Sequence, residues 1–189
     1  MEYPILLYRD GDEWSEWLER YHATARGVWV RLAKKGSKLE SVSRDDALDV
    51  ALCYGWIDGQ AKANDAESWL QKFTPRGKKS LWSKRNREHV ERLIASGRMR
   101  PAGFAAIEAA KLDGRWERAY DSPASATVPE DFQAALDDHP EARQFFESLG
   151  STRRFAILYR IQTAVKAETR ARRIDHFIDM LERRETLNP

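Results

Sequence analysis

The sequence predicts an α+β fold, with a small antiparallel sheet and helices in the N-terminal part and an all-helical C-terminal part. Two observations carry this prediction. Short apolar runs with strand-like alternation occur only before Pro75, and the apolar stripes beyond it recur at helical spacing. The strand-like runs are joined mainly by hairpin-style connections, which favour antiparallel pairing. A strand followed by a glycine-rich loop and a helix does not occur, so a doubly wound parallel sheet is not expected.

The segment up to Pro75 is expected to hold four strands and two helices. Its strands cover residues 5–8, 27–33, 56–62 and 67–74, with the first at a sheet edge and the last two forming a hairpin around Asn64-Asp65. One helix follows Asp10 and places Trp14, Trp17, Leu18 and Tyr21 on a single face. The other begins at Ser43 and ends at Gly55.

The segment after Pro75 reads as helices only. They are expected at 83–97, 101–114, after a capping box formed by Thr127 and Glu130, at 140–150, from 151 onward, and around Ile174–Leu181. Residues 121–127 have the composition of a surface linker. We therefore expect an α+β domain at 1–120 and a helical region at 128–189. That region should pack on the domain, because its apolar stripes need cover.

Composition limits the class of protein. Hydrophobic residues make up 42% of the chain and charged residues 33%, with seven Trp and seven Phe, which fits a folded core and no membrane span. The net charge is only +2, so any affinity for anions must come from local clustering. The first residues lack the pattern of a signal peptide, and we expect a cytoplasmic protein. The single cysteine, Cys53, is expected to be an inert core residue.

The stretch Lys72–Arg100 is the main candidate for function. It holds ten basic residues against two acidic ones, with aromatic residues interleaved. This combination suits phosphate contacts and stacking, and the helix start near Ser83 would add free backbone N–H groups. The competing interpretation is a solvated charged face with Phe73 and Trp82 in the core. The predicted ligand-binding residues are Trp56, Asp58, Lys72, Arg76, Ser80, Trp82, Ser83 and Asn86.

Asp58 is a separate point of interest, because it lies inside an apolar strand where a carboxylate needs a partner. An ion pair with Lys72 or Arg76 is one expectation. A pocket beside Trp56 that is lined by Asp58 is the other.

Motifs for metal, cofactor or nucleophile chemistry are absent. The four histidines have no ligand spacing, and no Cys-x-x-Cys, Gly-x-Ser-x-Gly, Walker or Gly-x-Gly-x-x-Gly pattern occurs. We expect no metal and no cofactor, and nothing demands an enzyme. A second basic stretch at 153–173 weakly resembles a helix-turn-helix.

Several linked motifs resemble the bacteriocin-protection, YdeI/OmpD-associated family, over nearly the whole chain. They are Gly27–Trp29, Ala33–Gly36, Cys53–Gly59, Phe73–Arg76, Ser80–Ser83 with Asn86, Gly97–Met99, Pro101–Gly103, Tyr159–Ile161 and Glu168–Ile174. The resemblance implies a link to bacteriocin protection, envelope stress and an outer-membrane porin. It attaches no catalytic mechanism and no residue roles.

Three functions stay open from the sequence. The first is a non-enzymatic protein that binds a small anionic ligand around residues 56–86. The second is an enzyme with a pocket lined by Trp56, Asp58, Arg76 and Trp82. The third is a nucleic-acid-binding module that uses stretches 72–100 and 153–173. No membrane insertion is expected, and no protein partner is indicated.

Overall fold

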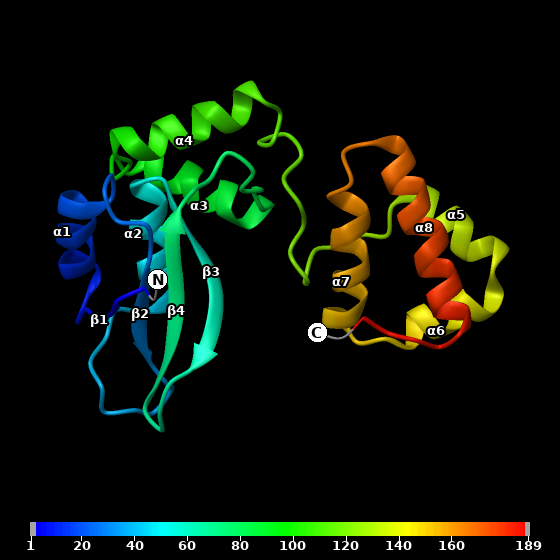
Figure 1. Cartoon of the computed structure of the whole chain (residues 1–189), viewed down its shortest axis with the longest axis horizontal. Coiled ribbons are helices and arrows are strands. Elements are labelled where there is room, and N and C mark those ends of the chain that lie inside the picture. The colour runs from blue at the N-terminus through cyan, green and yellow to red at the C-terminus, as the bar shows by residue number, and fades with distance from the viewer. Residues whose placement is uncertain (1–2, 188–189) are drawn as a thin grey trace. The chain divides into compact units, whose positions relative to one another are not determined.

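A computed structural model describes residues 3–187 of the chain, and these residues form a four-stranded sheet and eight helices (Figure 1). The chain divides into two compact units. Unit 1 runs to Leu81 and continues with Asn86–Glu117, and unit 2 comprises Trp82–Arg85 and the residues from Arg118 onward. The strands lie in the N-terminal half and helices make up the C-terminal part, so the predicted α+β class is confirmed. The packing of the helical region on the α+β domain stays a prediction.

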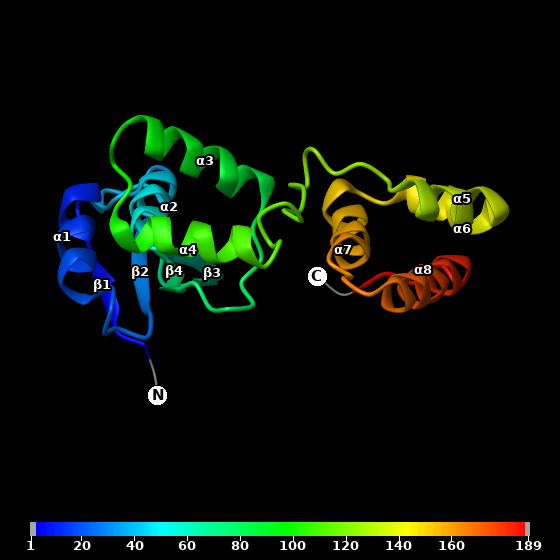
Figure 2. The ribbon, with the colours of Figure 1, turned by 90° about the horizontal axis from the view of Figure 1, so that it is seen from above.

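Unit 1 holds the sheet and four helices, each close to its predicted place. They are β1 (Ile5–Leu7), α1 (Gly11–Tyr21), β2 (Val28–Ala33), α2 (Arg44–Cys53), β3 (Trp56–Ala63), β4 (Ser68–Pro75), α3 (Lys84–Ala95) and α4 (Pro101–Leu112). Figures 1 and 2 show α3 and α4 at one end of the sheet, and α2 packs against α1, β3 and α4. This end of unit 1 is where the candidate site forms.

The sheet has the strand order β1-β2-β4-β3 and is mixed. β4 pairs antiparallel with both β2 and β3, as the predicted hairpin requires, and the ladder is irregular between Asp58 and Ala61. β1 lies at an edge, as predicted, but pairs parallel with β2, with Ile5 opposite Trp29. The departure from a purely antiparallel sheet has a simple cause: α1 is a crossover that returns the chain in its original direction.

An aromatic cluster forms the centre of the unit 1 core. Trp14 and Phe73 are fully buried and Trp56 is 1% exposed. The Trp14 ring lies 5.6 Å from Phe73 and 6.3 Å from Trp56. Both indole N–H groups are satisfied, since Trp14 donates to the carbonyl of Ala47 and Trp56 to that of His22. Burying each such ring stabilises the fold by roughly 1.5–3 kcal/mol.

Local signals fix the ends of α1 and α2. The Asp10 side chain accepts hydrogen bonds from the amides of Asp12 and Glu13, which caps α1. Ser43 caps α2 in the same way through the amide of Asp46. Gly55 follows α2 at φ +72°, and a Cβ there would lie 2.7 Å from the carbonyl of Ala102. Glycine is therefore needed both for the turn and for the close approach of α4.

Unit 2 is a helical bundle with its own core. Its helices are α5 (Glu130–Asp138), α6 (Pro140–Ser148), α7 (Ser151–Gln162) and α8 (Ala167–Glu182), and α8 packs against the other three. Phe132, Phe146 and Phe177 are among its buried residues. The expected capping box at Thr127 is wrong: the residue at the cap position of α5 is Pro129, which has no side-chain donor or acceptor.

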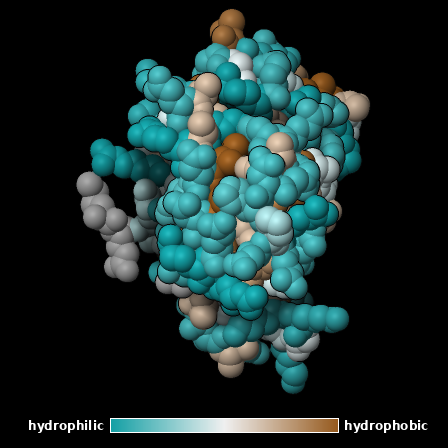
Figure 3. Space-filling view, turned by 90° about the vertical axis from the view of Figure 1, so that its right-hand side faces the viewer, coloured by the Kyte–Doolittle hydropathy of each residue, from teal (hydrophilic) through white to brown (hydrophobic). Residues whose placement is uncertain are grey.

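The exposed surface agrees with a chain of which a third is charged. The face drawn in Figure 3 is mainly hydrophilic, with small scattered hydrophobic areas. Within residues 3–187, no helix has the length and apolarity needed to cross a bilayer.

Candidate functional site

Half of the residues predicted to bind a ligand are buried in the folded protein. Trp56 and Trp82 are each 1% exposed, and Ser83 and Asn86 are each 8% exposed. Phe73 and Trp82 therefore pack in cores, as the competing interpretation of the basic stretch expected.

Asp58 has an ion-pair partner that the sequence did not suggest. Its carboxylate lies 3.0 Å from Nη2 of Arg44, at the start of α2. Lys72 instead places its ammonium 4.4 Å from the centre of the Tyr3 ring. The expected pair with Lys72 or Arg76 is thus replaced by one with Arg44, because Arg44 follows the Ser43 cap and lies near the start of β3.

Arg76 and Ser80 belong to the loop after β4. Nη1 of Arg76 donates to the carbonyl of Leu81 over 3.1 Å, and its Nε and Nη2 are buried from solvent. Ser80 Oγ accepts from the amide of Gly77. The predicted residues also fall in both units, because Trp82 and Ser83 belong to unit 2 and the others to unit 1. A ligand site made by these residues stays a prediction.

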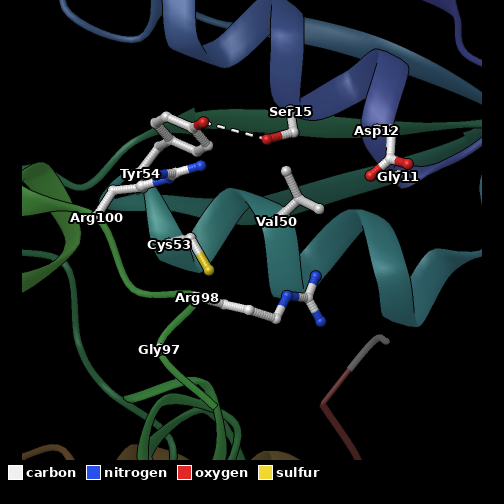
Figure 4. A pocket seen from close by; sticks show the side chains of 9 residues that line it. All are labelled: Gly11, Asp12, Ser15, Val50, Cys53, Tyr54, Gly97, Arg98 and Arg100. Atoms are coloured by element: carbon white, nitrogen blue, oxygen red, sulfur yellow. Dashed lines mark hydrogen bonds between the residues drawn. The ribbon is translucent and has the colours of Figure 1, made fainter. Parts of the chain in front are cut away.

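A polar groove in unit 1 is the better candidate (Figure 4). Its first part has a volume of about 260 Å³ and its second about 370 Å³, and both are lined by Ser15, Tyr54 and Arg100. The first part adds Gly11, Asp12, Val50, Cys53, Gly97 and Arg98, and the second adds Glu16, Glu19 and Arg20. We call the whole the α1–α2 groove.

Three segments build the groove. Helix α1 supplies one wall, and the end of α2, with Cys53 and Tyr54, supplies the floor. The loop between α3 and α4 supplies the opposite wall. Its backbone is held in place, because the amide of Arg98 donates to the carbonyl of Leu93 and that of Arg100 to the carbonyl of Cys53.

Alternation along this loop presents two arginines to the groove. Met99 is 8% exposed and anchors the loop, whereas its neighbours Arg98 and Arg100 are exposed. The nearest carboxylate to Arg98 is that of Asp49, at 4.0 Å. Asp49 is already held by Arg92 at 2.7 Å and by His89 at 2.6 Å. The Arg100 guanidinium makes no hydrogen bond or ion pair with any described residue. Both guanidinium groups are therefore available to an anion.

Two hydroxyl groups lie between the walls. Tyr54 donates to Oε2 of Glu19 over 2.8 Å, and its oxygen lies 3.1 Å from Oγ of Ser15. Burial raises the pKa of Tyr54, and the carboxylate of Glu19 raises it further, against the effect of the Ser15 hydrogen bond. Tyr54 is thus a hydrogen-bond donor at neutral pH and not a base that would activate Ser15.

Cys53 faces the groove but is not an activated nucleophile. It is 4% exposed, and burial raises the pKa of its thiol, although the positive charge of Arg98 opposes this. The sequence-based expectation of a buried cysteine is confirmed. No group of three or more metal-ligating side chains occurs within residues 3–187. The chemistry that this groove offers is recognition by guanidinium and hydroxyl groups.

Sequence reasoning missed most of this site. The basic stretch Lys72–Arg100 includes Arg98 and Arg100 but does not distinguish them from its other basic residues, and no sequence-based prediction names Ser15, Glu19 or Tyr54. A signal was present: Asp12, Ser15, Glu16 and Glu19 share the face of α1 that is opposite to the Trp face.

Comparisons with known families match two separate parts of the chain, much as the structure divides it into two units. A family model described as bacteriocin-protection, YdeI or OmpD-associated matches residues 125–184. The expected resemblance is confirmed there, but only over that part of the chain. The motifs quoted between Gly27 and Gly103 lie instead within residues 6–106, which match a domain of unknown function, DUF8412. No curated protein and no solved structure matches the chain. The chain thus belongs to the DUF8412 family through residues 6–106, and it carries a region of the bacteriocin-protection, YdeI or OmpD-associated type at residues 125–184.

Proposed function

We propose that this protein is a non-enzymatic binding protein whose α1–α2 groove takes a small anion. The observation that carries the proposal is the pair of exposed guanidinium groups of Arg98 and Arg100 on one wall of the groove. A guanidinium group suits a carboxylate or a phosphate, because it can donate two parallel hydrogen bonds. The description of the family matched at 125–184 names bacteriocin protection, and this supports bacteriocin protection as the setting of this binding.

The groove is better suited to binding than to catalysis. Its hydroxyl groups are hydrogen-bonded to each other and to Glu19, and its thiol is buried. A nucleophile requires an adjacent base or a lowered pKa. The shifts at Tyr54 and Cys53 run upward, away from what nucleophilic chemistry needs.

Thermal unfolding with and without phosphate, sulfate, citrate and acetate at low salt tests the proposal. Binding to the native state alone raises the melting temperature. Arg100→Ala should weaken binding about tenfold or more, since a charge-assisted hydrogen bond contributes about 1.5–3 kcal/mol.

Arg26→Ala is the matched control, because Arg26 is also an exposed arginine of unit 1 but does not line the groove. If Arg26→Ala and Arg100→Ala weaken binding equally, the attraction is diffuse electrostatics and the site is wrong. If none of the anions shifts the melting temperature, the proposed function is wrong.

A further inference from the structure

The two long walls of the α1–α2 groove carry opposite charges. Helix α1 supplies three acidic residues, Asp12, Glu16 and Glu19, against one basic residue, Arg20, and the α3–α4 loop supplies Arg98 and Arg100. Among the described residues, no carboxylate of the α1 wall forms an ion pair with either arginine across the groove. Opposite charges at the surface ordinarily pair when they can reach each other. Across this groove they do not pair.

The carboxylates of the α1 wall have oxygens that can still accept hydrogen bonds from a ligand. Glu16 lies 3.7 Å from Arg20, and both of these side chains are well exposed. Glu19 accepts one hydrogen bond, from Tyr54, through Oε2. Asp12 forms no side-chain hydrogen bond or ion pair with any described residue. The α1 wall therefore offers carboxylate oxygens to a cationic group.

We propose that the ligand of this groove is a linear zwitterion, such as a short peptide or an amino acid. Its carboxylate lies at Arg98 and Arg100, and its ammonium group lies at the α1 wall, beside Glu19. This inference rests on the proposed function, because it assigns the anionic end to the same arginines. A ligand with both charges gains from both walls, whereas an inorganic anion is repelled by the α1 wall.

The hydroxyl groups of Tyr54 and Ser15 fit the middle of such a ligand. Their oxygens are 3.1 Å apart, with Ser15 projecting from α1 and Tyr54 directly following the end of α2 (Figure 4). A peptide group between the two charged ends would present a carbonyl and an N–H at this level. Because Tyr54 donates to Glu19, Ser15 donates its own proton to Tyr54, and the Ser15 oxygen can accept from the N–H of such a peptide group.

Triglycine and two derivatives of the same length test the inference by titration calorimetry at pH 7 and low salt. N-acetyltriglycine lacks the ammonium group and triglycinamide lacks the carboxylate. At pH 7 the amino group is charged, because its pKa is about 8. Triglycine should bind about tenfold more tightly than either derivative, and one charge contact of about 1.4 kcal/mol accounts for that ratio.

Variants of the two walls assign each end of the ligand. Glu19→Gln keeps an acceptor for Tyr54 but removes the charge. It should reduce the preference for triglycine over N-acetyltriglycine several-fold and leave the affinity for N-acetyltriglycine no weaker. Arg100→Ala should weaken the binding of both triglycine and N-acetyltriglycine. Glu91→Gln is the control, because Glu91 is exposed on α3 and does not line the groove.

The outcomes separate this inference from the proposed function. Equal binding of triglycine and N-acetyltriglycine would overturn the zwitterion and leave the anion site intact. Triglycinamide binding as tightly as triglycine would overturn the role of the arginines and so both proposals. If none of the three peptides binds but phosphate or citrate does, and Arg100→Ala weakens it, only the zwitterion is overturned.

Discussion

On α3, Nη2 of Arg92 donates to both carboxylate oxygens of Asp49 on α2, over 2.8 and 2.7 Å. His89 adds a third contact, with Nδ1 2.6 Å from Oδ1 of Asp49. Asp49 is 5% exposed, so this carboxylate joins two helices inside unit 1. Arg92 and His89 hold Asp49 at short distances, whereas Arg98 forms only a long ion pair of 4.0 Å with it and also lines the groove.

Asp49→Asn should therefore destabilise the protein. The substitution keeps the shape but removes the charge that Arg92 and His89 contact, and hydrogen bonds to a charged group contribute about 1.5–3 kcal/mol. We expect the lower part of that range, because the Arg92 side chain is 55% exposed. Urea denaturation measures the loss, with Glu91→Gln on the exposed face of α3 as control. An unchanged midpoint for Asp49→Asn would contradict the role of this contact.

Gly103→Ala should destabilise the protein, although glycine to alanine within a helix ordinarily stabilises by about 1 kcal/mol. A Cβ at Gly103 would meet Sδ of Met99 and the carbonyl of Cys53, and would lie 2.9 Å from the carbonyl of Leu52. Backbone atoms cannot give way cheaply, so overpacking should cost about 1–3 kcal/mol.

Gly11→Ala is the matched comparison, measured by thermal unfolding beside Gly103→Ala. A Cβ at Gly11 meets only Val50 Cγ2, at an ordinary 3.6 Å. This variant should be stabilised, by about 0.4–1 kcal/mol. If Gly103→Ala is stabilised as well, the close crossing of α2 and α4 is wrong.

Cys53 should react slowly in the native protein. Burial raises the pKa of its thiol and also blocks the approach of a reagent, so little reactive thiolate forms at pH 8. Labelling with a chromogenic disulfide should be at least about tenfold slower in buffer than in 6 M urea, a minimal estimate for a thiol that reacts only on local opening. Equal rates in the two solvents would show that Cys53 is accessible.

Asp131→Asn should destabilise unit 2 in a manner that depends on pH. Arg170 donates to both carboxylate oxygens of Asp131, over 2.6 and 2.8 Å, and these hydrogen bonds lower the pKa of Asp131. A lowered pKa contributes stability above the unfolded value of about 3.9, which is lost as the pH falls through the folded value.

The difference from the unaltered protein should be at most about 1 kcal/mol at pH 7, because the Asp131 side chain is 46% exposed. It should begin to shrink as the pH falls below about 3.9, vanish once the pH lies below the lowered pKa of the folded state, and be smaller in 1 M salt. Asp138→Asn, at an exposed position of α5, should show no such loss. A difference that persists unchanged at low pH would argue against the ion pair as its source.

The fold was readable from the sequence where local pattern decides structure. The alternation at Val28–Leu32 and the turn at Asn64-Asp65 were enough to predict β2, β3 and β4. The direction of β1 was not, because three residues carry no information about the strand with which they pair. The start of α5 was misplaced because a capping box was expected at Thr127, whereas the chain begins the helix after Pro129.

The site was harder to predict, because it depends on contacts between distant segments. Local charge drew attention to residues 72–86, but Trp82 is needed in a core and Nε and Nη2 of Arg76 are buried. The groove joins residues 11–20 to residues 97–100 across the end of α2, a contact that no local pattern reveals. The pairing of Asp58 with Arg44 was missed for the same reason.

The most direct test of the anion site is the NMR signal of the arginine side chains. The Nε–H groups of Arg98 and Arg100 should shift and sharpen when sodium citrate is added at low ionic strength, because each then donates to a bound carboxylate. The Nε–H signal of Arg26, an exposed arginine outside the groove, should stay unchanged in the same spectra. If the signals of Arg98 and Arg100 move no more than that of Arg26, the α1–α2 groove is not an anion site.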